Sequence, residues 1–112
     1  MAKALLLAWS SPASASAEAV AAFDAWYDTT HIPQVRDAIG SITRVSRFRL
    51  VDPESGRPEN RFLAVYELDD ADIPAAAAAL GAASAAGRMQ LSAAIDLSGN
   101  PPAAQWYQAH PA

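Results

Sequence analysis

Residues 41–68 read SITRVSRFRLVDPESGRPENRFLAVYEL, and they predict two strands joined by a loop. Ser41 to Val51 is rich in β-branched and aromatic residues, which favour strands. Asp52 to Pro58 contains prolines and a glycine, which favour a turn. Arg61 to Leu68 alternates, so that one face carries Phe62, Ala64, Tyr66 and Leu68 and the other carries Leu63, Val65 and Glu67. The stretch therefore predicts a β-hairpin within an antiparallel sheet.

A further strand is predicted before this hairpin. Residues 3–10 are almost continuously apolar, which is the pattern of a strand covered on both faces. The run also resembles a weak secretory signal, because it follows a lysine and precedes alternating alanines and serines. A signal peptide needs roughly 7–15 apolar residues, whereas Ala4 to Trp9 supplies six. We therefore interpret the run as the first strand and expect a cytoplasmic protein.

A helix is predicted between these strands. Ser16 is a suitable N-cap. Apolar residues then recur at steps of three and four, at Val20, Phe23 and Tyr27, and the next position of this stripe is residue 30 or 31. Because proline disfavours helix in the residue before it, Ile32-Pro33 is expected to end this helix. A short helix should follow from Gln34 to Ile39, with Gly40 as its left-handed stop.

The C-terminal part predicts one more helix and one more strand. Asp72 is a suitable N-cap, and Pro74 suits the first turn of the alanine-rich helix over 75–86, which Gly87 should end. Gln90 to Leu97 alternates like a strand. The tail 101–112 holds Trp106 and Tyr107, so we expect it to pack on its own sheet edge or on a partner.

The predicted order is β-α-β-β-α-β, which is typical of the ferredoxin-like fold. We therefore expect residues 1–112 to form one α+β domain with an antiparallel sheet. Helices on one side would leave the other face of the sheet bare, although the strands are apolar on both faces. A homodimer packed through this bare face would cover it.

Composition excludes several classes of function. The net charge is −4 and no long basic tract is present, so we expect neither nucleic acid nor a membrane surface as a partner. The chain has no cysteine, which excludes disulfides, thiolate metal sites and a cysteine nucleophile. Glycine-rich phosphate loops and paired metal-binding histidines are also missing from the sequence. We therefore expect no cofactor and no metal.

Residues 23–35, FDAWYDTTHIPQV, are followed by Ile39-Gly40 and by Arg47-Phe48 in a strand. This arrangement resembles the EthD-like branch of the dimeric α/β-barrel superfamily. The resemblance implies a dimer, with a pocket between sheet and helices in each subunit. It also implies that His31 is the pocket's acid or base. Activities in the superfamily include polyketide cyclases, lactone isomerases, dehydratase-like lyases, cofactor-free monooxygenases and some haem proteins.

Side-chain chemistry also makes His31 the leading candidate for proton transfer. His31 has a donor, an acceptor and a pKa near working pH, so it can move a proton; alternatively, it caps the end of the first helix. Tyr27 and Tyr66 are candidate hydroxyl donors to a substrate carbonyl or enolate, or else core aromatics. Asp28, three residues before His31, can orient the imidazole if the helix continues, or it is a solvated carboxylate.

The remaining candidates concern substrate binding. Arg47 either forms a cross-strand ion pair with Glu67 or holds a substrate carboxylate. Four aromatic residues are candidate walls of a pocket, with ordinary core packing as the alternative: Trp9, Phe23, Trp26 and Phe48.

Together these features predict a cofactor-independent enzyme of cyclase, isomerase or lyase type. Its substrate would be a small hydrophobic molecule with a carbonyl group, such as a polyketide or aromatic intermediate. One alternative is a cofactor-free monooxygenase acting on a phenol or quinol. Another is a non-catalytic binding or stress-response module in which His31 is structural.

Overall fold

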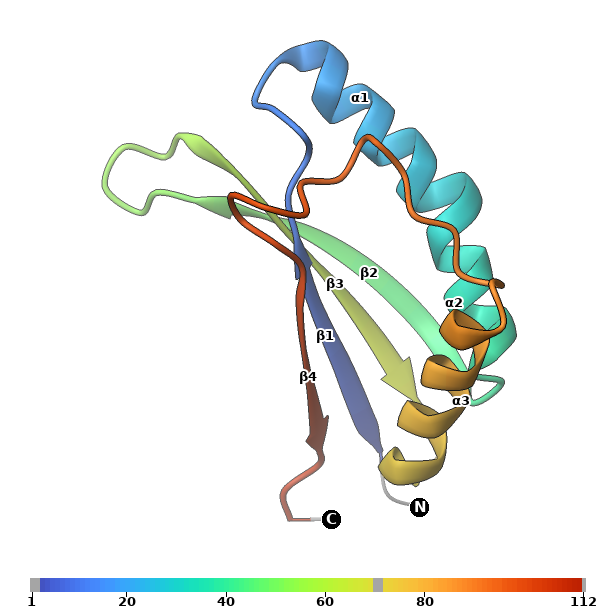
Figure 1. The fold of residues 1–112 in the computed structure, drawn as a ribbon. Coiled ribbons are helices and arrows are strands. Elements are labelled where there is room, and N and C mark those ends of the chain that lie inside the picture. Colours follow the sequence, from blue (N-terminus) through green and yellow to red (C-terminus); the bar gives the residue numbers. More distant parts are fainter. Residues whose placement is uncertain (1–2, 70–71, 112) are drawn as a thin grey trace.

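The predicted hairpin lies in a four-stranded antiparallel sheet. The structure is a computed structural model that describes residues 3–69 and 72–111 (Figure 1). The strand order is β2-β3-β1-β4, and every pair is antiparallel. Along the chain the elements are β1 (Ala4–Ser10), α1 (Ala17–Trp26), the π-helical turn η1 (Tyr27–His31), α2 (Ile32–Ala38), β2 (Ile42–Val51), β3 (Pro58–Leu68), α3 (Ile73–Ala85) and β4 (Ala103–Gln108). This order and topology confirm the α+β, ferredoxin-like prediction.

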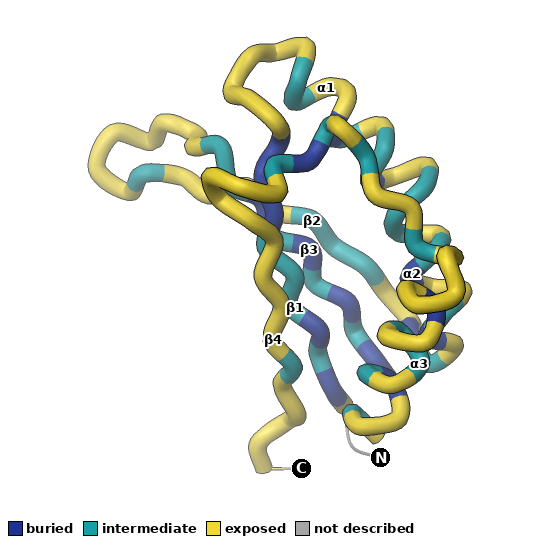
Figure 2. Tube along the Cα trace, viewed as in Figure 1, coloured by how far each residue is buried: buried dark blue, intermediate teal, exposed yellow. Residues whose placement is uncertain are grey.

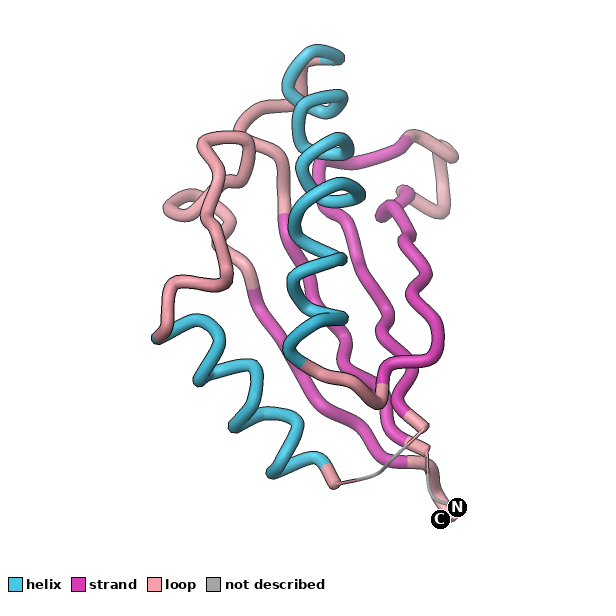
Figure 3. Tube along the Cα trace, turned by 90° about the vertical axis from the view of Figure 1, so that its right-hand side faces the viewer, coloured by secondary structure: helices cyan, strands magenta, loops and turns pink. Residues whose placement is uncertain are grey.

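All the helices lie on one side of the sheet (Figures 1 and 3). Two predicted N-caps are confirmed: Ser16 Oγ accepts from Ala19 N at 3.1 Å, and Asp72 Oδ1 accepts from Ala75 N at 3.1 Å. Among the described helices, none has the length and apolarity needed to cross a bilayer.

The predicted break at Pro33 is wrong. The helix runs on from α1 into α2 through the π-helical turn, in which Ile32 N donates to Tyr27 O. Proline lacks an N–H and its ring crowds the preceding turn, and the wider π-turn accommodates both effects without ending the helix. Gly40 is not left-handed either: among the described glycines only Gly56 and Gly87 have positive φ, and α2 ends at an extended Ile39.

The last strand lies in the tail, so the prediction of a strand over Gln90 to Leu97 is wrong. Strand β4 fills the free edge of β1, with Trp106 opposite Leu6. The tail therefore packs on its own sheet. The Asp96 carboxylate accepts from the backbone N–H groups of residues 98–100, which bends the chain before β4. An alternating apolar pattern does not make a strand when another segment occupies the available edge.

The core lies between the helices and one face of the sheet, where Figure 2 shows the deepest burial on β1 and β3. Register explains this placement, because Leu6 pairs with Tyr66 and Ala8 pairs with Ala64, so alternate residues of both strands face the helices. The buried cluster includes Leu6, Phe23, Tyr27, Val35, Ile39, Phe62, Tyr66 and Leu68.

The opposite face of the sheet, which we call the open face, is also apolar. By strand alternation it carries Leu5, Leu7, Trp9, Phe48, Leu50, Leu63, Val65 and Tyr107. Within residues 3–69 and 72–111, no helix packs against this face (Figure 1). Phe48 and Leu50 are 56% and 51% exposed as a result.

Hydrogen exchange distinguishes the observed fourth strand from the predicted one. We expect amides of residues 104–108 that face β1 to exchange slowly, because ladder hydrogen bonds protect them. Amides of residues 90–94 should exchange much faster, since that segment joins no ladder. Two-dimensional NMR in D₂O measures both, with the central strand β3 as the protected control. Slow exchange over residues 90–94 together with fast exchange over residues 104–108 would contradict the topology.

Candidate functional site

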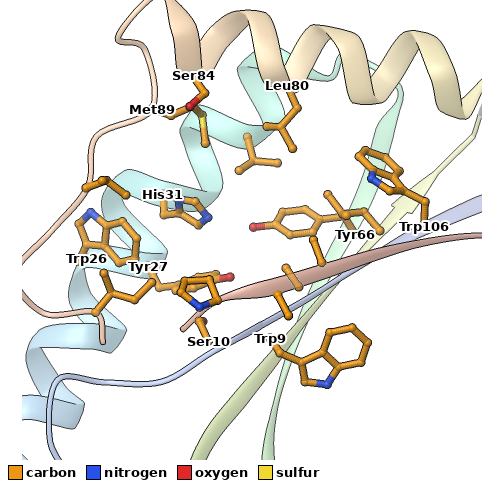
Figure 4. A pocket seen from close by; sticks show the side chains of 18 residues that line it. Trp9, Ser10, Trp26, Tyr27, His31, Tyr66, Leu80, Ser84, Met89 and Trp106 are labelled. Carbon is orange, nitrogen blue, oxygen red and sulfur yellow. The ribbon is translucent and has the colours of Figure 1, made fainter. Parts of the chain in front are cut away.

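A cavity of about 340 Å³ lies between the sheet and the helices. Its walls come from β1, β3 and β4 below, the α1–η1–α2 helix on one side, and α3 with the following loop above (Figure 4). Most of its 18 lining residues are apolar. Its polar side chains are Ser10, Tyr27, His31, Tyr66 and Ser84.

His31 enters the cavity from the end of the π-helical turn. Its ring stacks on Trp26, with centroids 4.8 Å apart and an angle of 25° between the planes. It meets the Tyr27 ring edge-on, also at 4.8 Å. Nδ1 is buried and has no hydrogen-bond partner. Because burial disfavours the imidazolium, the pKa of His31 is lowered to about 4, so the ring is neutral at pH 7. Since the helix continues past His31, the alternative role of capping a helix end does not fit.

Two tyrosines and a serine supply hydroxyls near this ring. In Figure 4 the Tyr66 hydroxyl points toward the imidazole. Burial raises the pKa of Tyr66 far above its ordinary value. Burial also raises the pKa of Tyr27, an effect that neighbouring Ser10 and Tyr66 and the charge of Arg47 partly oppose. Both phenols therefore stay protonated at neutral pH and can donate hydrogen bonds.

Three of these polar atoms are buried without a partner: Ser10 Oγ, His31 Nδ1 and Tyr66 Oη. An unsatisfied buried polar group costs about 1–3 kcal/mol, so such groups are uncommon in folded proteins. Here they line one cavity. A ligand with matching polar atoms would remove this cost.

Asp28 and Arg47 lie outside the cavity. Arg47 Nη1 is 2.9 Å from Asp24 Oδ1 and 3.5 Å from Asp28 Oδ1, which ties β2 to the helix. The guanidinium carbon also lies 4.6 Å from the centroid of the Tyr27 ring. Asp28 therefore contacts Arg47 rather than the unpartnered Nδ1 of His31. The π-turn explains this, because in its wider turn residues three positions apart no longer share a face as they do in an α-helix.

The predicted Arg47–Glu67 ion pair is wrong. Glu67 is opposite Arg44 in the register, and Arg44 Nε lies 3.8 Å from its carboxylate. Arg47 is opposite Ala64 instead, on the face that meets the helices. Residues 44 and 47 are an odd number of positions apart, so they point to opposite faces of the sheet.

The aromatic candidates separate into three groups. Trp26 lines the cavity, as does Trp9, although the Trp9 ring projects to the open face (Figure 4). Phe23 is fully buried beside Tyr27 and Phe62 and does not line the cavity. Phe48 is exposed on the open face.

Sequence reasoning missed several lining residues. Ser10 shares a face with Leu6 by simple alternation, which was a usable signal. Trp106 was noted in the tail, but its position in the cavity depends on the pairing of β4 with β1. Leu80 and Met89 enter through the placement of α3 and its loop. Within the described ranges, no group of three or more histidines, aspartates or glutamates is arranged to hold a metal.

The lowered pKa of His31 predicts a pH-dependent stability. Unfolding returns the pKa from about 4 toward 6.5, so the unfolded state takes up the proton first as the pH falls. Stability should therefore decline between pH 6.5 and pH 4 by roughly 3 kcal/mol from this group. Urea unfolding at pH 7 and pH 4 measures it against His31→Gln, which lacks the titration. An identical pH dependence in both proteins would contradict the burial of a neutral His31.

Comparison with known proteins identifies the fold. No family model matches the sequence, and no curated protein matches it. The structure resembles an EthD-like protein of Ralstonia eutropha JMP134, with a TM-score of 0.61 and 17% identity over 92% of this chain and 88% of the other. It also resembles an ethyl tert-butyl ether D (EthD) family protein of Bacillus halodurans C-125, with a TM-score of 0.49 and 15% identity over 92% and 95% of the two chains. A dimeric ferredoxin-like protein of unknown function from Thermobifida fusca YX has a TM-score of 0.45 and 14% identity over 97% and 92%. The predicted resemblance thus holds at the level of the fold: this chain has the ferredoxin-like fold of an EthD-like protein.

Proposed function

We propose that this protein is a cofactor-independent enzyme of cyclase, isomerase or lyase type, acting on a small hydrophobic molecule with a carbonyl group. A polyketide or aromatic intermediate is the kind of substrate that fits. One observation carries the proposal: a neutral histidine with an unpartnered nitrogen shares an apolar cavity with an unpartnered phenol, His31 Nδ1 and Tyr66 Oη. A base and a hydrogen-bond donor are the two groups that enolisation needs.

In the proposed reaction, Tyr66 Oη donates a hydrogen bond to the substrate carbonyl oxygen. His31 removes a proton from the adjacent carbon, and the electron pair of that C–H bond forms the enolate. The hydrogen bond strengthens as negative charge develops on the oxygen. The enolate and the new imidazolium form a neutral pair in an apolar cavity. Return of the proton at another carbon gives an isomer, attack on a second carbonyl gives a ring, and expulsion of a leaving group gives an elimination.

In this proposal Tyr27 orients the His31 imidazole, and Arg47 in turn positions Tyr27. The Tyr27 ring contacts the imidazole edge-on, and its hydroxyl is the second candidate donor. The Arg47 guanidinium lies over the Tyr27 ring, 4.6 Å from its centroid, and Asp24 and Asp28 hold the guanidinium in place. We therefore assign Arg47 and Asp28 to positioning Tyr27, and we assign the Trp26 side chain to the substrate wall.

Deuterium exchange tests the proposed base without knowledge of the natural substrate. We expect the protein to accelerate exchange of the methyl protons of 2-acetylnaphthalene in D₂O, followed by NMR. His31→Gln should lower the rate by about 100-fold or more, the usual contribution of a general base. Tyr66→Phe should lower it by about 100-fold, as for loss of one oxyanion donor. Because the base must be neutral, the rate should be constant above about pH 5 and fall through pH 4.

Leu97→Ala is the control for this assay, since Leu97 is half exposed and lies outside the cavity. Equal exchange rates in wild type and His31→Gln would overturn the role of His31. Binding of the ketone with no exchange in any variant would favour a non-catalytic binding module. Oxygen consumption with a phenol or quinol would favour the monooxygenase alternative.

We also propose that the protein is a homodimer joined through the open face. An exposed apolar sheet face is unfavourable in water, and a second copy offers a matching apolar surface. Arg44 and Glu67 lie side by side on this face, so a two-fold axis can bring each near its opposite charge in the partner.

Two leucines with the same exposure test the dimer. Leu50 on the open face and Leu97 outside the sheet are both 51% exposed. Leu50→Glu should convert the dimer to monomer, because association would bury two unpaired carboxylates, one from each copy. Leu97→Glu, which lies outside the proposed interface, should leave the dimer intact. Sedimentation velocity at equal concentrations measures the difference. A wild-type monomer, or a dimer unaffected by Leu50→Glu, would contradict the proposal.

A further inference from the structure

We infer that the cavity accepts an uncharged carbonyl compound, such as a ketone or ester, and excludes carboxylates of the same shape. This inference rests on the proposed function in taking the cavity as the substrate site. It adds the charge state of the substrate, which the proposed chemistry leaves open. Three observations support it: the composition of the lining, the commitments of nearby arginines, and the kind of polar atoms that lack partners.

The lining carries no formal charge. Among the 18 lining residues that the structure describes, none is Asp, Glu, Lys or Arg. The lining therefore provides no fixed counter-charge, and the nearby cation of Arg47 lies against the Tyr27 ring and pairs with two aspartates. Moving a carboxylate from water into such a cavity is strongly unfavourable, while a neutral carbonyl group needs only one or two hydrogen bonds.

The two arginines that bridge the layers, Arg47 and Arg61, are not among the residues that line the cavity. Arg47 Nη1 pairs with Asp24 and Asp28, whereas its buried Nη2 has no hydrogen-bond partner. The guanidinium lies against the Tyr27 ring, and Tyr27 lines the cavity whereas Arg47 does not. Arg61 donates to Ser11 Oγ and to the backbone carbonyls of residues 100 and 101. Neither arginine is placed to receive a substrate carboxylate, in contrast with the sequence-based suggestion for Arg47.

The unpartnered polar atoms match a neutral ligand. Tyr66 Oη is a donor suited to a carbonyl oxygen, and Ser10 Oγ can donate or accept. His31 is the titratable base of the cavity, and the titratable groups that face it are Tyr27 and Tyr66, which stay neutral. A carboxylate could be neutralised in the cavity only by a proton on itself or on His31. Burial opposes protonation of His31, because it disfavours the imidazolium.

Three probes of nearly equal shape test the inference: 2-acetylnaphthalene, 2-naphthoate and 2-isopropenylnaphthalene. They present a ketone, a carboxylate and a hydrocarbon in the same position. Titration of the purified full-length protein at pH 8, followed by NMR or calorimetry, measures their affinities. We expect the ketone to bind at least about tenfold more tightly than the carboxylate. The ketone should also bind more tightly than the hydrocarbon, and Tyr66→Phe should abolish that second difference while leaving hydrocarbon binding intact.

A variant that adds a cation provides the converse test. Ser84 is exposed and lies on the cavity wall, so a longer side chain there can reach the cavity without disturbing the core. Ser84→Lys should increase the affinity for 2-naphthoate several-fold. Ser84→Gln, which is long but neutral, should not.

The outcomes separate this inference from the proposed function. Tighter binding of 2-naphthoate than of the ketone, or no binding of any probe, would overturn the inference. Preference for the ketone without deuterium exchange would retain the inference and refute the catalytic role of His31. Exchange of the ketone together with equal affinity for ketone and carboxylate would retain the catalytic role and overturn the charge selectivity.

Discussion

The contact between Arg47 and the first helical segment is the interaction on which the site depends. Its guanidinium meets two carboxylates on α1 and η1, Asp24 at 2.9 Å and Asp28 at 3.5 Å, and lies among aromatic rings. Only 18% of the Arg47 side chain is exposed, so this pairing is screened less than a surface ion pair. It holds the helix against β2 and β3. The cavity is left on the other side of the same helix, above β1 and β4.

The site combines an apolar enclosure with polar atoms that the protein itself does not satisfy. Such atoms lower the stability of the folded state, and functional sites are where this cost is commonly retained. The same enclosure keeps His31 neutral and keeps both phenols protonated. One physical cause, removal from water, therefore sets the protonation states of the candidate base and of its candidate hydrogen-bond donors.

Local patterns predicted the elements whose signals lie within a few residues. The hairpin, the first strand and the caps at Ser16 and Asp72 depend on alternation, turn residues and short side-chain hydrogen bonds. Two local rules failed where the surroundings outweighed them. Pro33 was accommodated by a wider turn, and the edge of β1, which residues 90–97 would have filled, is held by β4.

The sequence by itself determined the class of fold, the order of its main elements and the nomination of His31, Tyr27 and Tyr66. Those features follow from periodicity, from side-chain chemistry and from a resemblance over residues 23–48. The tertiary structure alone decided which polar groups share the cavity and which pair elsewhere. It placed Ser10 and Trp106 in the cavity, and it directed Asp28 and Arg47 toward each other. These placements depend on strand register and on the extra residue of the π-turn, which no pattern of nearby residues specifies.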